Sequence, residues 1–174
     1  MMLPRVKELK KGIPVGTELP AQQRYGNIGR WVETELANNG YAVSNDKGVD
    51  MPDLGVEVKS RKKESNSNHT VGTMRIDEII ATDYPNSVIY EKFQQQYRVH
   101  YSDEGQVVTK EGIYDFSDNY IQRNVAEAYE SGRKKIIENE ENGYHPPYVK
   151  GTGWGHWEIT DSCGSYRFRI PIIS

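Results

Sequence analysis

Three carboxylates and one lysine lie within ten residues of the chain, in the run Asp-Met-Pro-Asp-Leu-Gly-Val-Glu-Val-Lys from Asp50 to Lys59. The end of this run alternates like a β-strand, which places Glu57 and Lys59 on one face with their Cα atoms about 7 Å apart. Carboxylates bind hard divalent cations such as Mg²⁺, which lower the pKa of a bound water and neutralise phosphate charge. A lysine beside the cation assists both effects. The run therefore predicts a site for phosphodiester hydrolysis.

The same run also fits a solvated surface strand, because charged residues that alternate with valines commonly face water. The two aspartates favour the metal site. Asp50 and Asp53 precede the strand at a turn through Pro52, from which a side chain can fold back over the polar face of the strand. A surface strand does not need that arrangement.

Length and composition limit what can position this site. A chain of 174 residues suits one domain with a continuous core. We expect an irregular N-terminal arm over residues 1–25, which contain Pro4, Pro14 and Pro20, and a single domain over residues 26–174. With 22 basic and 25 acidic side chains the net charge is -3, so the overall charge does not indicate a nucleic-acid partner.

Hydrophobic periodicity predicts helices and strands that alternate without strict βαβ order, which favours the α/β (mixed α+β) class, with a mixed β-sheet flanked by helices. Apolar residues at helical spacing between Gly26 and Gly40 predict a helix. The other expected elements are a strand over 54–60, a hairpin of 96–101 with 107–109, a helix over 118–138, and a second hairpin of 157–159 with 166–170.

Basic residues are concentrated locally. Arg61, Lys62 and Lys63 follow the acidic strand, and another cluster at residues 133–135 lies on the later predicted helix. An acidic protein can present such a cluster to phosphates, although each also fits ordinary solvated surface. The Ser-, Asn- and Lys-rich stretch over 62–70 predicts a loop that becomes ordered on binding.

The single Cys163 excludes an intramolecular disulfide and a cysteine-based zinc site, and fits a reducing compartment. No apolar run approaches about 18 residues and no leader pattern precedes the chain, so we expect a cytoplasmic protein without a membrane span. The four histidines lack the spacing of a zinc hydrolase.

Four segments, in order along the chain, resemble those of a known enzyme family. They are Gly26-Asn-Ile-Gly-Arg-Trp-Val-Glu33, then Asp50 followed seven residues later by Glu57 and next by Lys59, then Ser87-Val-Ile-Tyr-Glu-Lys-Phe93, and finally Gly164-Ser-Tyr-Arg-Phe-Arg-Ile-Pro171. Together they resemble the PD-(D/E)XK nuclease superfamily, and within it the family of the MutH mismatch-repair endonuclease and the restriction enzymes that cut GATC sites. The resemblance implies a restriction-endonuclease-like fold.

The resemblance also implies roles for individual residues. Asp50 and Glu57 would bind Mg²⁺, or Mn²⁺ in its place, with the backbone carbonyl of Val58 as a further ligand. Lys59 would orient or help to deprotonate the attacking water, and Glu33 would act near the metal through water or a second ion. The interval of seven selects Asp50 as first ligand, whereas many superfamily members use the aspartate after proline, here Asp53. The expected DNA contacts are Lys92 at the scissile phosphate and Arg61, Lys62, Lys63 and Tyr166 elsewhere.

These observations predict a Mg²⁺-dependent, sequence-specific endonuclease of double-stranded DNA, of restriction or strand-nicking type. Cleavage of both strands would need a homodimer or two successive events. The alternatives are a structure-directed repair or recombination nuclease and a non-catalytic DNA-binding module with a degenerate site. The sequence ends soon after Tyr166, where MutH continues into an arm associated with activation by MutL, so dependence on a MutL-like activator is not expected.

Overall fold

The computed structural model describes residues 3–20, 27–104, 106–161 and 164–171. Within these ranges, two four-stranded sheets and four α-helices confirm the mixed α/β class. The chain forms two compact units: an N-terminal unit of Pro4–Asn66 and Gln94–Phe116, and a C-terminal unit of Met1–Leu3, Ser67–Phe93 and Ser117–Ser174. The single domain expected over residues 26–174 stays a prediction.

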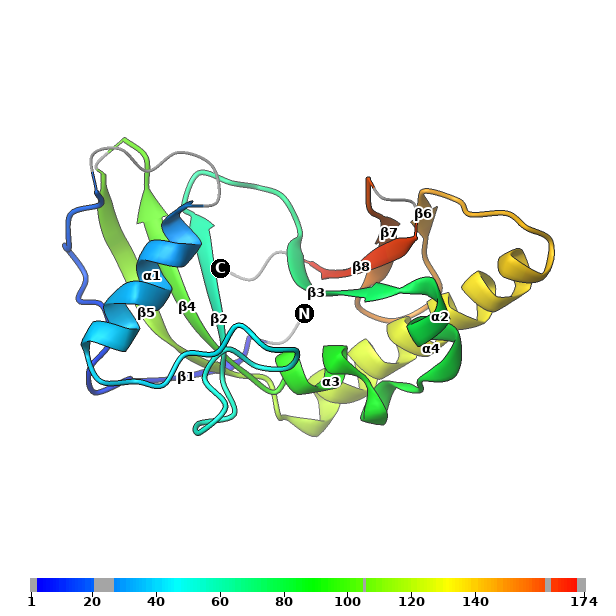
Figure 1. Ribbon diagram of the computed structural model, residues 1–174, viewed down its shortest axis with the longest axis horizontal. Helices are drawn as coiled ribbons and strands as arrows, with labels where there is room; N and C mark the ends of the chain where they lie inside the picture. The colour runs from blue at the N-terminus through cyan, green and yellow to red at the C-terminus, as the bar shows by residue number, and fades with distance from the viewer. Residues whose placement is uncertain (1–2, 21–26, 105, 162–163, 172–174) are drawn as a thin grey trace. The chain divides into compact units, whose positions relative to one another are not determined.

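The sheet of the N-terminal unit has the strand order β1 (Arg5–Lys7), β5 (Val107–Asp115), β4 (Gln95–Ser102) and β2 (Glu57–Lys62) (Figure 1). Strands β4 and β5 pair antiparallel, which confirms the first predicted hairpin. Strand β2 pairs parallel with β4, so the strand that carries the acidic run lies at an edge of the sheet.

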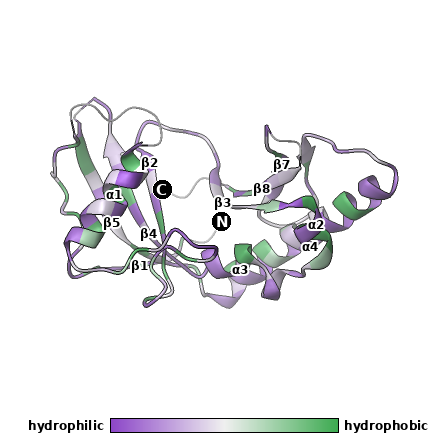
Figure 2. Cartoon of the chain, viewed as in Figure 1, coloured by the Kyte–Doolittle hydropathy of each residue, from purple (hydrophilic) through white to green (hydrophobic). Residues whose placement is uncertain are grey.

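Helix α1 (Asn27–Asn38) confirms the first predicted helix and buries Ile28, Val32 and Leu36. Figure 2 shows apolar and polar residues along the same helix, as expected of a helix with one buried face. The buried side chains belong to a core that also contains Val58 and Tyr97 from the sheet.

Residues of the expected N-terminal arm also join this core. Leu9, Ile13 and Leu19 are buried in it. The backbone N–H of Ile13 donates to the hydroxyl of buried Tyr97 at 2.8 Å, which fixes the segment against the sheet. Residues 3–20 therefore do not form a separate arm, because apolar side chains between the prolines have a core to enter.

The C-terminal unit is an antiparallel sheet with helices. Its strand order is β3 (His69–Arg75), β8 (Ser165–Ile170), β7 (His156–Ile159) and β6 (Tyr148–Val149), and the pairing of β7 with β8 confirms the second hairpin. The helical segments are α2 (Ile76–Ala81), the short 3₁₀ helix η1 (Tyr84–Asn86), α3 (Val88–Lys92) and α4 (Asn119–Glu141). Helix α4 confirms the predicted long helix and is capped by Asp118, whose side chain accepts hydrogen bonds from two backbone N–H groups of the first turn.

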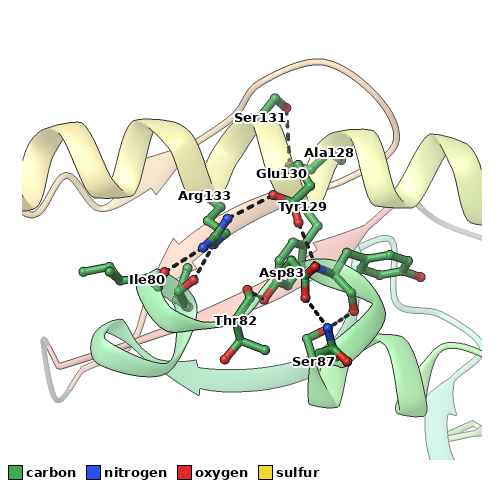
Figure 3. Close-up of polar contacts among 12 residues, drawn as sticks. Ile80, Thr82, Asp83, Ser87, Ala128, Tyr129, Glu130, Ser131 and Arg133 are labelled. Atoms are coloured by element: carbon green, nitrogen blue, oxygen red, sulfur yellow. Dashed lines mark hydrogen bonds and ion pairs between the residues drawn. The ribbon is translucent and has the colours of Figure 1, made fainter.

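Arg133 on α4 holds the end of α2 (Figure 3). Its guanidinium donates to the carbonyl oxygens of Ile79 and Ile80, each at 2.7 Å, and to Glu130 at 3.3 Å. Carbonyl groups in the last turn of a helix have no hydrogen-bond donor within the helix, and here Arg133 supplies the donors. This member of the basic cluster at residues 133–135 thus has a structural role. Within the described ranges, no helix is long and apolar enough to cross a membrane.

Candidate active site

A tight turn over Met51–Val56 precedes strand β2. Met51 N–H donates to Val56 O at 2.8 Å, and Val56 N–H donates back to Met51 O at 3.2 Å. Gly55 has φ 65°, a left-handed conformation that glycine adopts without strain. Strand β2 consequently begins at Glu57 rather than at residue 54. Because Met51 pairs with Val56, the residues just outside the turn, Asp50 and Glu57, face each other.

Asp50 forms one hydrogen bond with Glu57 and one with Val58. The backbone N–H of Asp50 donates to Glu57 Oε1 at 3.2 Å, and the backbone N–H of Val58 donates to Asp50 Oδ2 at 2.9 Å. Asp53, the alternative first ligand, is exposed within the turn. The geometry therefore brings Asp50, and not Asp53, to Glu57.

Glu57 is 2% exposed although its side chain is a carboxyl group. Its Oε2 atom lies 3.2 Å from Nζ of Lys59, which is 27% exposed at its side chain. A buried carboxylate is costly unless it is paired, and a solvated surface strand would expose it. The surface-strand alternative does not fit this burial. Glu57 and Lys59 share one face of β2, as the alternation predicted, while Val56 and Val58 face the core.

Glu33 on α1 lies close enough to Asp50 for the charge of Asp50 to affect its pKa. Partial burial, and secondarily the charge of Asp50, raise the pKa of the Glu33 carboxyl, while Arg30 opposes the shift. Repulsion between two carboxylates is relieved when a cation binds between them. Gly26, at the start of the predicted motif, lies outside the described residues.

The oxygen donors fit a hard cation. In the part of the chain that the structure describes, no three His, Cys, Asp or Glu side chains come together as a metal-binding group. Mg²⁺ is commonly held by one or two carboxylates and keeps several waters. If Mg²⁺ binds here, Asp50 and Glu57 would be the two carboxylates, the carbonyl of Val58 would be a further oxygen ligand, and Glu33 would accept from a metal-bound water.

Two residues beside the site did not emerge from the sequence. In the parallel pairing of β2 with β4, Glu57 lies opposite Gln96 and Lys59 lies opposite Arg98. Gln96 is 0% and Arg98 is 2% exposed. Nε and Nη2 of Arg98 donate to Gln96 Oε1 at 2.9 and 2.7 Å. Burial, with a smaller contribution from the charge of Arg61, lowers the pKa of Arg98 to about 10. The alternation of polar residues in Gln-Tyr-Arg-Val-His can be read from the sequence, but the sequence does not show that this strand pairs with β2.

The predicted basic DNA contacts point in different directions. Arg61 lies on the face of Glu57 and Lys59, and its Nη2 donates to Ser65 O at 3.3 Å. Lys62 forms an ion pair with Asp103, which raises the pKa of the lysine. Lys63 is exposed. Arg61 is therefore the member of this group placed on the polar face of the site.

Two further predicted residues belong to the C-terminal unit. Lys92 ends α3, and its side chain passes beside Gly72. Its contact with the scissile phosphate stays a prediction. Tyr166 is 1% exposed, and its hydroxyl donates to Pro146 O at 2.7 Å. A buried tyrosine that is bonded within the protein is not available to DNA, which corrects the contact predicted for it.

Compared with known proteins, the chain matches no family model, and no curated protein matches its sequence. The likeness to the nuclease superfamily therefore continues to rest on the four sequence segments. The arrangement of Asp50, Glu57 and Lys59 does not depend on that likeness, because it is observed directly in the contacts of this chain.

Proposed function

We propose that this protein is a Mg²⁺-dependent endonuclease that hydrolyses phosphodiester bonds of double-stranded DNA at specific sequences. The observation that carries the proposal is the convergence of two carboxylates and one ammonium group. The backbone nitrogen of Asp50 lies 3.2 Å from Glu57 Oε1, and the Asp50 carboxylate accepts the next N–H of the strand, that of Val58, at 2.9 Å. Lys59 Nζ lies 3.2 Å from Glu57 Oε2. This donor set supplies the ligands and the proton donor that hydrolysis of a phosphodiester requires.

The contacts of each residue in the site indicate its role in the proposed hydrolysis. Bound Mg²⁺ would activate a water and offset negative charge on the phosphate. Asp50 and Glu57 would hold it, with the Val58 carbonyl as a third protein oxygen. Lys59 is held beside Glu57 and can donate a hydrogen bond to a phosphate oxygen or to the attacking water. Glu33, whose pKa is raised by burial and by Asp50, can accept a proton from water near the site.

The acids also argue against a purely DNA-binding module, because carboxylates beside a phosphate weaken binding unless a cation joins them. One such site cuts one strand, so we propose a homodimer or two successive events for cleavage of both strands. The proposal places the enzyme in the cytoplasm, where its DNA substrate and Mg²⁺ are both available.

Supercoiled plasmid provides the test. We expect the wild type to convert it to the nicked or linear form with Mg²⁺ and not with EDTA, and Glu57→Gln to be inactive. Glu35→Gln, on the same helix as Glu33, is the matched control and should retain activity. Absence of metal-dependent cleavage on plasmid, linear and branched DNA would refute the proposal, whereas cleavage of branched DNA alone would favour a structure-directed nuclease.

A further inference from the structure

The polar face of the N-terminal sheet is arranged in rows that cross strands β2, β4 and β5. The first row contains Glu57 and Gln96, and the second contains Lys59 and Arg98. A third row follows, in which Arg61 lies opposite His100 and His100 lies opposite Lys110. We call Arg61, His100 and Lys110 the basic row.

The basic row concentrates charge of one sign. The charged groups that act on His100 are Arg98 from its own strand, Lys110 from β5 and Arg61 from β2, and all three are cations. Burial first, and then these charges, lower the pKa of His100 to about 4. Two cations, Arg61 and Lys110, thus flank a histidine that their charges help to keep neutral in the free protein.

Two polar atoms at the row have no hydrogen-bond partner among the residues that the structure describes. They are His100 Nε2 and the hydroxyl of Tyr114, and both are buried. The two rings are stacked, with centroids 6.0 Å apart and planes at 9°. Lys110 Nζ lies 5.6 Å from the centroid of Tyr114, and Tyr114 itself is 1% exposed. Lys110 is exposed while Arg61 and His100 are half-buried, so the two cations and one side of the His100 ring border solvent, and His100 Nε2 lies just beneath.

We propose that the basic row is an anion site, which binds a backbone phosphate of the same nucleic-acid strand that is cut at Asp50 and Glu57. This inference rests on the proposed nuclease function. Arg61 follows Glu57 by four residues, which is about 13 Å along the strand. A stacked nucleic-acid strand covers that distance in about four nucleotides, at about 3.4 Å each. The nucleic acid would thus follow β2 from the metal to the basic row.

The site has a consequence for pH dependence. A bound phosphate favours the imidazolium form, so it raises the pKa of His100 from its low value in the free protein. Linkage is reciprocal, and protonation of His100 therefore strengthens phosphate binding by the same factor. Each unit by which the His100 pKa rises corresponds to up to a tenfold gain in affinity at low pH. Binding measured in EDTA should become tighter as the pH falls toward 5.

Nuclear magnetic resonance of the His100 ring tests the proposal in EDTA, where no cleavage is needed. The probes are inorganic phosphate and a single-stranded DNA of twelve nucleotides, and His100→Gln assigns the signal. We expect both probes to shift the His100 resonance and to raise its pKa. Lys110→Gln should reduce the slope of log affinity against log salt for the oligonucleotide by about 0.7, the value for one phosphate contact. Lys10→Gln removes an exposed lysine of the same unit and should leave the slope unchanged.

Each outcome decides one point. An oligonucleotide that binds without shifting His100, and with the same salt slope for Lys110→Gln, overturns the proposal. A response to inorganic phosphate alone overturns the nucleic-acid path. If His100 responds to both probes while the wild type cuts no DNA, the anion site stands and the nuclease function fails.

Discussion

Replacing Asp50 by Asn or by Ala should separate its structural role from its role toward a metal. Asp50 Oδ2 accepts the backbone N–H of Val58 at 2.9 Å, and Val58 is 8% exposed. The amide oxygen of Asn can accept the same hydrogen bond, whereas Ala leaves a buried N–H without a partner. Asn also removes the negative charge that acts on Glu33.

The sizes of these effects follow from the contacts. A buried N–H without its partner costs about 1–3 kcal/mol, so Asp50→Ala should lose that amount in EDTA. Asp50→Asn exchanges a charge-assisted bond for a neutral one, worth about 1 kcal/mol, and relieves repulsion with Glu33. We therefore expect Asp50→Asn to lie within about 1 kcal/mol of the wild type in EDTA.

Added Mg²⁺ should separate the wild type from Asp50→Asn, although the two have similar stability in EDTA. A ligand at a hundred times its Kd stabilises the folded state by about 2.7 kcal/mol. For a chain of this length that corresponds to a rise in Tm of about 5–10 °C. The wild type should gain this stability, and both variants should gain little, because each has lost one of the two carboxylates.

Urea unfolding followed by circular dichroism, in EDTA and at saturating Mg²⁺, measures both effects. Two results would refute the reasoning. Equal losses for Asp50→Asn and Asp50→Ala in EDTA would show that the bond to Val58 does not matter. An unchanged Mg²⁺ response in Asp50→Asn would remove Asp50 from the metal site.

Three further substitutions test other parts of the structure. Folding raises the pKa of Glu33 above its ordinary value of 4.5, so the contribution of Glu33 to stability is present below pH 4.5 and is lost as the pH rises through the folded-state pKa. Glu33→Gln should therefore remove this pH dependence from the urea midpoints measured in EDTA. Tyr97→Phe leaves the N–H of Ile13 without its 2.8 Å partner and should cost about 1–3 kcal/mol on urea unfolding, or none if residues 3–20 do not pack on the sheet. Gly132→Ala would place a Cβ 2.5 Å from Cδ1 of Trp157, and overpacking should cost about 1–3 kcal/mol with altered tryptophan fluorescence, whereas an unchanged spectrum would contradict that contact.

Local patterns were sufficient for much of the fold. Helical periodicity identified α1 and α4, and strand alternation around short turns identified both hairpins. The interval of seven between Asp50 and Glu57 was also readable, because it is set by one tight turn whose ends pair through Met51 and Val56. Elements that depend on neighbours in sequence were thus predictable.

Features that depend on distant segments were not. The parallel pairing of β2 with β4, which brings Gln96 beside Glu57, joins segments with no sequence signal for their register. The burial of Ile13 depends on the hydroxyl of Tyr97, far along the chain. Tyr166 has the sequence context of an exposed hairpin residue, but its position in β8 places it on the buried face, with Phe168 and Ile170.

The rate of Mg²⁺-dependent plasmid nicking by Asp50→Asn, compared with Asp53→Asn, examines the site most directly. Both variants remove one carboxylate within the same four residues, yet only Asp50 contacts Glu57 and Val58. We expect Asp50→Asn to lower the rate by about a hundredfold or more and Asp53→Asn to leave it unchanged. Full activity in Asp50→Asn together with loss in Asp53→Asn would contradict the assigned metal ligand and the site built on it.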